Sequence, residues 1–212
     1  MTTATKSLKA ANLAWQWSVV AVDTLVIVLL AFPELLTNGA VKEFAWVRAL
    51  FAGAAPVIVL LIASLFSSDI KATLVFWRIK ETLPGHRAFS VHALCDPRID
   101  LEALRKHVGA FPQAAREQNA LWFKLYKKVE SEITVAEAHR HYLLFRDLAS
   151  MSILLIPIAA VALHFTGASG IAALSAAVFL FVQYAATAIA ARHSGIGFVT
   201  NVLTLHSVKR YV

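Results

Sequence analysis

Cysteine and charged residues are both scarce in this sequence of 212 residues. The one cysteine, Cys95, excludes an internal disulfide framework and any zinc site built from several cysteines. Charged residues make up 16% of the chain and hydrophobic residues 58%, whereas soluble domains usually carry about 25% and about 45 to 50%. This composition indicates a membrane protein, and the length leaves no room for a large soluble catalytic domain beside several apolar segments.

The motifs of common enzyme classes are also missing. The sequence has no Gly-rich phosphate loop, no Gly-x-Ser-x-Gly elbow, no His-Glu-x-x-His pair and no multi-histidine iron boxes. Glu137, His139 and His141 come closest to a metal site. On a helix, however, His139 points away from the other two, and catalytic zinc generally needs three protein ligands. We therefore expect a protein that is not an enzyme and that holds no cofactor or metal.

Four apolar runs approach the roughly 20 residues that a helix needs to cross a bilayer. They cover residues 13–32, 46–66, 148–165 and 171–191. The first is long and is followed by Pro33 and Glu34, which is unlike a cleaved signal peptide. The sequence thus predicts an all-α integral membrane protein with four transmembrane helices, the last two joined by a tight loop at residues 166–170.

The distribution of Lys and Arg predicts the orientation. Thirteen of the twenty lie between Lys71 and Arg146, whereas only Lys42 and Arg48 lie near the first connection and none lies in the second. By the positive-inside rule, both termini and the middle segment are cytoplasmic. We expect a multi-pass protein of the cell inner membrane, with the bilayer as its first partner.

The middle segment, residues 67–147, lacks linker composition and carries enough aromatic side chains to fold as a small helical cytoplasmic module. Asp100 is a plausible N-cap for a helix over 101–108, which Gly109 would end. A second helix is expected between Pro112 and Ser131, because its apolar residues recur at helical spacing.

The second and third spans are candidates for extension beyond the bilayer. Thr134 and Glu137 fit a capping box, and no helix breaker follows until Pro157. A helix over 135–165 would be about 46 Å long at 1.5 Å per residue, and would form a stalk. For the second span two alternatives stay open: continuation to Lys80, or a loop at residues 67–69.

The C-terminal residues 198–211 alternate apolar residues with Thr and Asn, which is typical of an interfacial amphipathic helix. The predicted organisation therefore has four regions: 1–66, the first pair of spans; 67–147, the module; 148–191, the second pair; and 192–212, the tail.

Asp23 lies near the middle of the first span, where a carboxylate costs roughly 2.5 to 3.5 kcal/mol to insert. An acid at this depth is a functional candidate that could bind an ion, relay a proton or join helices in an oligomer. The alternative is a structural Asp that hydrogen-bonds to Ser, Thr or Gln of a neighbouring helix. We favour this structural interpretation.

The basic residues of the middle segment do not by themselves indicate nucleic-acid binding. Thirteen positive charges face ten negative ones there, and the positive-inside rule alone accounts for that excess. Direct binding of nucleic acid is therefore the less favoured interpretation.

Several short strings in the middle segment stand out as a set. They are Phe76-Trp77-Arg78, Leu83-Pro84-Gly85-His86-Arg87-Ala88-Phe89, Asp96-Pro97-Arg98-Ile99-Asp100, Glu117-Gln118-Asn119 with Trp122, Leu125-Tyr126-Lys127, Ala138-His139 and Phe145-Arg146-Asp147. With the flanking spans, the chain resembles small multi-pass membrane proteins encoded beside retron reverse transcriptases in bacterial anti-phage defence systems. The resemblance implies an effector that a reverse transcriptase complex containing RNA and DNA keeps silent, and that damages the inner membrane when infection is sensed.

A cytoplasmic recognition surface is the site that this role would need. Its candidate residues are Trp77, Arg78, Arg87, Asp96, Arg98, Asn119, Trp122, Tyr126, His139, Arg146 and Asp147. For Trp122 and Tyr126, four apart on one helix face, core packing is the favoured interpretation. The leading hypothesis is a non-enzymatic membrane effector, with a second copy of the chain as a candidate partner in a homo-oligomer. The alternatives are a transporter or channel subunit that uses Asp23, and a passive anchor for a cytoplasmic complex.

Overall fold

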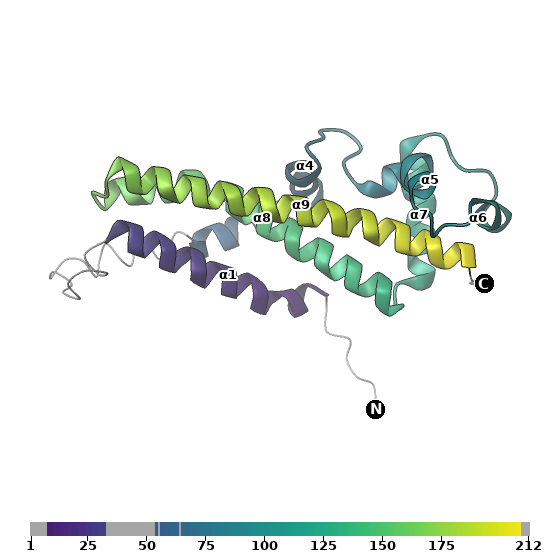
Figure 1. Cartoon of the computed structure of the whole chain (residues 1–212), viewed down its shortest axis with the longest axis horizontal. Helices are drawn as coiled ribbons and strands as arrows, with labels where there is room; N and C mark the ends of the chain where they lie inside the picture. The colour runs from purple at the N-terminus through teal and green to yellow at the C-terminus, as the bar shows by residue number, and fades with distance from the viewer. Residues whose placement is uncertain (1–7, 33–53, 55, 64, 209–212) are drawn as a thin grey trace, which may run out of the picture. The chain divides into compact units, whose positions relative to one another are not determined.

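The computed structural model describes residues 8–32, 54, 56–63 and 65–208, and every regular element within these ranges is helical (Figure 1). The predicted helical class is therefore confirmed. The longer elements are α1 (Leu8–Ala31), α4 (Ser68–Phe76), α6 (Leu101–Val108), α7 (Ala115–Val129), α8 (Ile133–Phe165) and α9 (Gly170–Val208). Between α4 and α6 lie a 3-10 turn (Pro84–Arg87), a π-helical turn (Ala88–His92) and the short α5 (Ala93–Cys95).

The chain divides into two compact units. The first unit comprises residues 1–67 and 146–188, and the second comprises residues 68–145 and 189–212. The four regions predicted from the sequence end within a few residues of these boundaries. The structure groups them in alternation, because the first and third regions form one unit and the second and fourth form the other. Helices α8 and α9 contribute to both units.

Three helices are long and apolar enough to cross a membrane: α1 from Asn12 to Ala31, α8 and α9. In the first unit, large apolar side chains are exposed along all three of them, among them Trp15, Leu25, Val161, Phe165, Ile171, Leu174 and Phe181. Such a continuous apolar surface is unusual for a soluble monomer and is expected against lipid. Of the second predicted span, residues 46–66, the structure describes only 54, 56–63, 65 and 66, which include a short helix at Pro56–Ala63.

The predicted tight loop between the last two apolar helices is confirmed. Gly167 adopts a left-handed conformation with φ of 76°, which glycine tolerates without a steric penalty. Its amide donates to the carbonyl of His164, and the amide of Ala168 donates to that of Leu163. This pair of bonds is the Schellman arrangement that ends α8. Ser169 then caps α9 through its hydroxyl oxygen, which accepts from a backbone amide in the first turn.

The core of the second unit is formed around the last third of α9. Phe198, Val199, Val202 and Leu203 are buried against apolar residues from the turns and helices between residues 88 and 135. The ring of Phe198 meets the indole of Trp122 edge-on, with ring centroids 5.1 Å apart. The sequence predicted that this segment is an interfacial amphipathic helix. That prediction is wrong, because its apolar face is buried inside the second unit.

The bounds of the short helices α6 and α7 agree with those predicted from local sequence signals. Asp100 caps α6 by accepting from the amides of Glu102 and Ala103, both at 2.9 Å. Gly109 follows the helix with φ of 84°. Helix α7 falls within the predicted segment 113–131.

The two predicted stalks have different outcomes. Helix α8 is continuous through Pro157, as predicted, although it begins at Ile133, so that Thr134 lies inside the first turn and is not the N-cap. The continuation of the second span to Lys80 is wrong, because α4 begins only at Ser68 and ends at Phe76. The next residue, Trp77, has φ of 52°, in the left-handed region that ends a helix.

Candidate functional site

Four of the candidate recognition residues lie in or against the core of the second unit, two of them buried and two half-buried. Trp122 and Tyr126 are 8% and 9% exposed, and their rings stack at 5.8 Å. The hydroxyl of Tyr126 lies 3.2 Å from Nδ1 of His139, whose ring stacks on Phe198 at 4.5 Å. The structural interpretation of Trp122 and Tyr126 is therefore confirmed. Asn119, the fourth residue, packs its side chain against Gly85, where a Cβ atom would collide with it.

The fully buried Gln118 organises the turns that precede α5. It belongs to the Glu117-Gln118-Asn119 string, but it is not among the candidate recognition residues. Its Oε1 accepts hydrogen bonds from the amides of Phe89 and Ser90 and from the hydroxyl of Ser90, each at 3.1 Å. Its Nε2 donates to the carbonyl of Gln113 at 3.3 Å. Phe89 and Ser90 lie in the first turn of the π-helical segment, where backbone amides have no acceptor within the helix, and Gln118 supplies that acceptor.

Asp96 and Arg98 form a clamp that reaches α9. The guanidinium of Arg98 donates to both carboxylate oxygens of Asp96, at 3.0 and 2.7 Å. The same guanidinium donates to Thr200 at 3.1 Å and to Asn201 at 3.3 Å. The hydrogen bond from Arg98 holds the pKa of Asp96 well below its usual range. This pair fixes the 96–98 turn on α9.

Arg146 and Asp147 belong to the first unit, apart from the other nine candidates. Their side chains pair at 3.0 Å and are 6% and 13% exposed.

The remaining candidates, Trp77, Arg78 and Arg87, lie beside residues of α9. Arg78 and Arg87 line a cavity of about 260 Å³ together with Phe76, Val91, His92, Arg192 and Ile196. Arg192 places its guanidinium 3.5 Å from the ring centroid of Trp77, and its Nε donates to the carbonyl of Val75. The stacking of Arg192 on Trp77 accompanies the left-handed backbone at Trp77 that ends α4.

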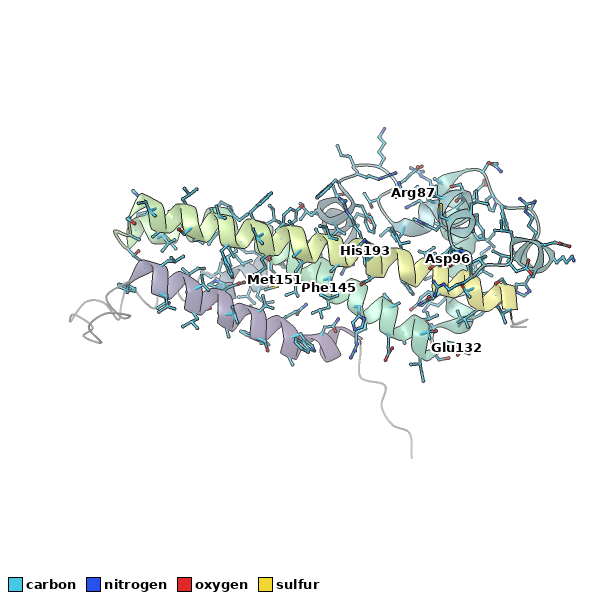
Figure 2. All side chains as sticks on the ribbon, viewed as in Figure 1. Arg87, Asp96, Glu132, Phe145, Met151 and His193 are labelled. Carbon is cyan, nitrogen blue, oxygen red and sulfur yellow. The ribbon has the colours of Figure 1, made fainter. Side chains whose placement is uncertain are left out.

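A second, larger cavity adjoins the first. It has a volume of about 440 Å³ and shares His92 and Ile196 with the smaller one. Figure 2 marks Asp96 and His193, which line the larger cavity, and Arg87, which lines the smaller one. We call the two cavities together the α9 pocket.

His92 stands between the two cavities and is 9% exposed. Its Nε2 is buried without a hydrogen-bond partner among the described residues. Burial, with a smaller contribution from the positive charge of Arg78, lowers the pKa of His92. Neither His92 nor Arg192 is among the site residues predicted from the sequence, because no local motif marks a lone histidine or a lone arginine.

Asp23 joins three helices of the first unit. Gln183 on α9 donates through Nε2 to Asp23 on α1 at 3.2 Å and to Ser152 on α8 at 3.0 Å. Asp23 is 2% exposed, and its Oδ1 has no hydrogen-bond partner in the described part of the chain. This geometry matches the structural alternative, in which Asp23 bonds to Gln or Ser of neighbouring helices.

Comparison of the chain with protein-family models, curated proteins and solved structures gave no match. Across residues 8–32, 54, 56–63 and 65–208, no three His, Cys, Asp or Glu side chains lie close enough together to hold a metal ion. The α9 pocket brings three arginines and a buried histidine together and is the candidate ligand site.

Proposed function

We propose that the protein is a non-enzymatic, four-span inner-membrane effector, with both termini cytoplasmic, whose second unit receives a signal in the cytoplasm. In this proposal the signal changes the packing of the spans and so perturbs or permeabilises the bilayer. One observation carries the proposal: α8 and α9 each run unbroken through parts of both units. At 1.5 Å per residue the 39 residues of α9 measure about 58 Å, roughly twice the thickness of a hydrocarbon core.

The coupling that we propose is mechanical. The last part of α9 supplies Phe198, Val199 and Val202 to the core of the second unit. An α-helix without a break transmits a change at one end as tilt or rotation at the other, because its packed neighbours allow discrete arrangements. A rearrangement around these residues would therefore move the part of α9 that holds Gln183. No chemical step is needed.

An anti-phage role is part of the proposal and is supported by the resemblance of the sequence strings. In that setting a reverse transcriptase complex would keep the protein silent, and homo-oligomers would assemble through the apolar helix faces. The exposed large side chains of the first unit, such as Leu174 and Phe181, supply area for contacts with lipid or with a second copy.

A transporter or channel subunit is the second candidate function. The unpaired Oδ1 of Asp23, buried among three helices, is the observation that favours it. A carboxylate oxygen without a partner in an apolar unit is a candidate to bind an ion or a proton.

Overproduction without a regulator, followed by a potential-sensitive dye, tests these functions against one another. We expect loss of membrane potential and growth arrest in every ionic background. Depolarisation that requires one particular ion would favour the transporter and contradict the proposal. A membrane that stays polarised at every expression level would favour a passive anchor and would also contradict it.

A further inference from the structure

The α9 pocket concentrates positive charge without a balancing acid in its smaller cavity. Arg78, Arg87 and Arg192 line that cavity, and no carboxylate is among its lining residues. In the described part of the chain neither Arg78 nor Arg87 forms an ion pair. Like charges held close together repel one another, so an arrangement of this kind is stabilised by an anion.

The three arginines of the cavity suit an anion with several acceptor oxygens. Trp77 and the carbonyl of Val75 hold Arg192 in place, whereas Arg78 is exposed and Arg87 is partly exposed. Each guanidinium presents a planar set of donors that matches the oxygens of a phosphate group. The cavity thus has one arginine held by neighbouring groups, Arg192, and two more exposed arginines, Arg78 and Arg87.

The buried histidine supplies an independent observation. His92 lines the same cavity, is nine-tenths buried, and leaves Nε2 without a hydrogen-bond partner among the described residues. An unsatisfied buried polar group costs about 1 to 3 kcal/mol. In the tautomer that has its proton on Nε2, His92 would donate a hydrogen bond to an anion in the cavity.

The volumes limit the size of the ligand. The cavity of about 260 Å³ lies just below the roughly 300 Å³ at which pockets for drug-sized ligands begin, so it suits a small anionic group. The adjoining cavity of about 440 Å³ has Cys95, Pro97, Ile196 and Thr200 in its wall, together with His193 and with Asp96, whose carboxylate is paired with Arg98. It would accommodate an uncharged part of the same molecule.

We propose that Arg78, Arg87, Arg192 and His92 bind the phosphate group of an anionic ligand in the α9 pocket. The phosphate group is either that of a lipid headgroup or that of a soluble phosphate compound. The claim that this ligand is the signal received by the second unit rests on the proposed function. The claim that the α9 pocket binds a phosphate group is independent of that function.

Calorimetry on the full chain in neutral detergent, at fixed ionic strength, tests the site. The probes are inorganic pyrophosphate and the soluble short-chain lipid dihexanoyl phosphatidylglycerol, with dihexanoyl phosphatidylcholine as the zwitterionic control. We expect saturable binding of pyrophosphate, of the phosphatidylglycerol, or of both, and the probe that binds more tightly identifies the source. Binding of neither would overturn the proposal.

Substitution of the two more exposed arginines, Arg78 and Arg87, tests whether they contribute to binding of the probe. The Arg78→Gln/Arg87→Gln variant should bind the successful probe at least about tenfold more weakly, because two charge-assisted interactions are lost. The matched control is Arg116→Gln/Lys124→Gln, which removes the same charge from exposed positions of α7 outside the α9 pocket and should bind within about twofold of the native protein. The single variants Arg78→Gln and Arg87→Gln repeat the test with less change to the fold. Equal binding by the pocket and control variants would overturn the proposal.

The two proposals fail in different ways. Probe binding that depends on Arg78 and Arg87, without any loss of membrane potential on overproduction, would contradict the effector function and leave the site standing. Depolarisation by a protein that binds neither probe would contradict the site and leave the effector function standing.

Discussion

At the scale of single residues, several of the resemblance strings owe their identity to packing in the second unit. Gly85 faces Asn119 and Trp122 so closely that a Cβ atom would lie 2.9 Å from Cε3 of the indole. Gln118 pairs the amides of the π-helical turn. These residues build the core, whereas Arg78 and Arg87 border the α9 pocket.

The close approach at Gly85 gives a stability prediction. Gly85→Ala forces the buried ring of Trp122 to move, and overpacking of this kind typically costs about 1 to 3 kcal/mol. Denaturant unfolding in detergent, followed by circular dichroism, measures that loss. Gly197→Ala is the control. Its added methyl meets nothing within 4 Å, and alanine is the better helix former, so this variant should be as stable as the native protein or slightly more so. Equal stability of the two variants would show that the contact at Gly85 is relaxed at no cost.

The Asp96–Arg98 pair gives a prediction on pH. The pKa of Asp96 is lower in the folded chain than its ordinary value of 3.8, so the unfolded chain takes up the proton first as pH falls. The stabilisation by the pair is therefore complete above about pH 5 and is lost progressively as pH falls below about 4. Melting temperatures of the native protein and of Asp96→Asn should differ most near neutral pH and converge in acid. A difference that stays constant down to about pH 3 would contradict this role of the carboxylate.

Glu102→Gln is the matched control for that measurement. Glu102 pairs with Lys106 at 2.7 Å, and the two side chains are 79% and 68% exposed. Exposed pairs of this kind contribute little to stability. The melting temperature of this variant should follow that of the native protein at every pH.

At the scale of elements, the sequence predicted the helix boundaries that are determined by residues close to them in the chain. Helix α6 lies between a capping Asp100 and a left-handed Gly109, and the loop before α9 carries Gly167 and Ser169, so both boundaries are encoded within a few residues. The length of α8 followed from the absence of a breaker before Pro157. That proline lies within an apolar helix, and its missing amide did not end the helix.

Elements whose ends depend on distant contacts were not predictable in this way. Nothing near Trp77 in the sequence ends a helix, and the residue that stacks on its ring, Arg192, comes from α9. Likewise, the apolar positions of residues 198–203 have the same pattern whether they face lipid or a protein core. Only the position of α7 and the turns before it shows that they are buried in the second unit.

The same distinction between local signals and distant contacts applies to the candidate site residues. Residue type alone predicts the recognition residues from the sequence. In the structure Trp122, Tyr126 and His139 lie in or against a core. Arg78 and Arg87 instead line a cavity together with Arg192. The last of these residues lies on α9, far along the chain, so no spacing rule connects it to the other two. His92 was missed for a similar reason, since one buried histidine has no motif.

At the scale of the whole molecule, the chain crosses between the two units along α8 and α9 without a break in either helix. In the proposed function, a ligand in the α9 pocket acts on the apolar unit through these two continuous helices. This coupling is the central claim of the proposal.

Membrane potential in cells that overproduce linker variants tests that claim most directly. We would insert a flexible Gly-Ser-Gly-Ser segment into α8 after Phe145 and into α9 after Ala188, which are the unit boundaries. The control carries the same segment after Ala168, in the loop between the two helices. We expect the control to depolarise the membrane like the native protein, and the boundary variant to insert, fold and leave the potential intact. Full depolarisation by the boundary variant would contradict mechanical coupling through α8 and α9.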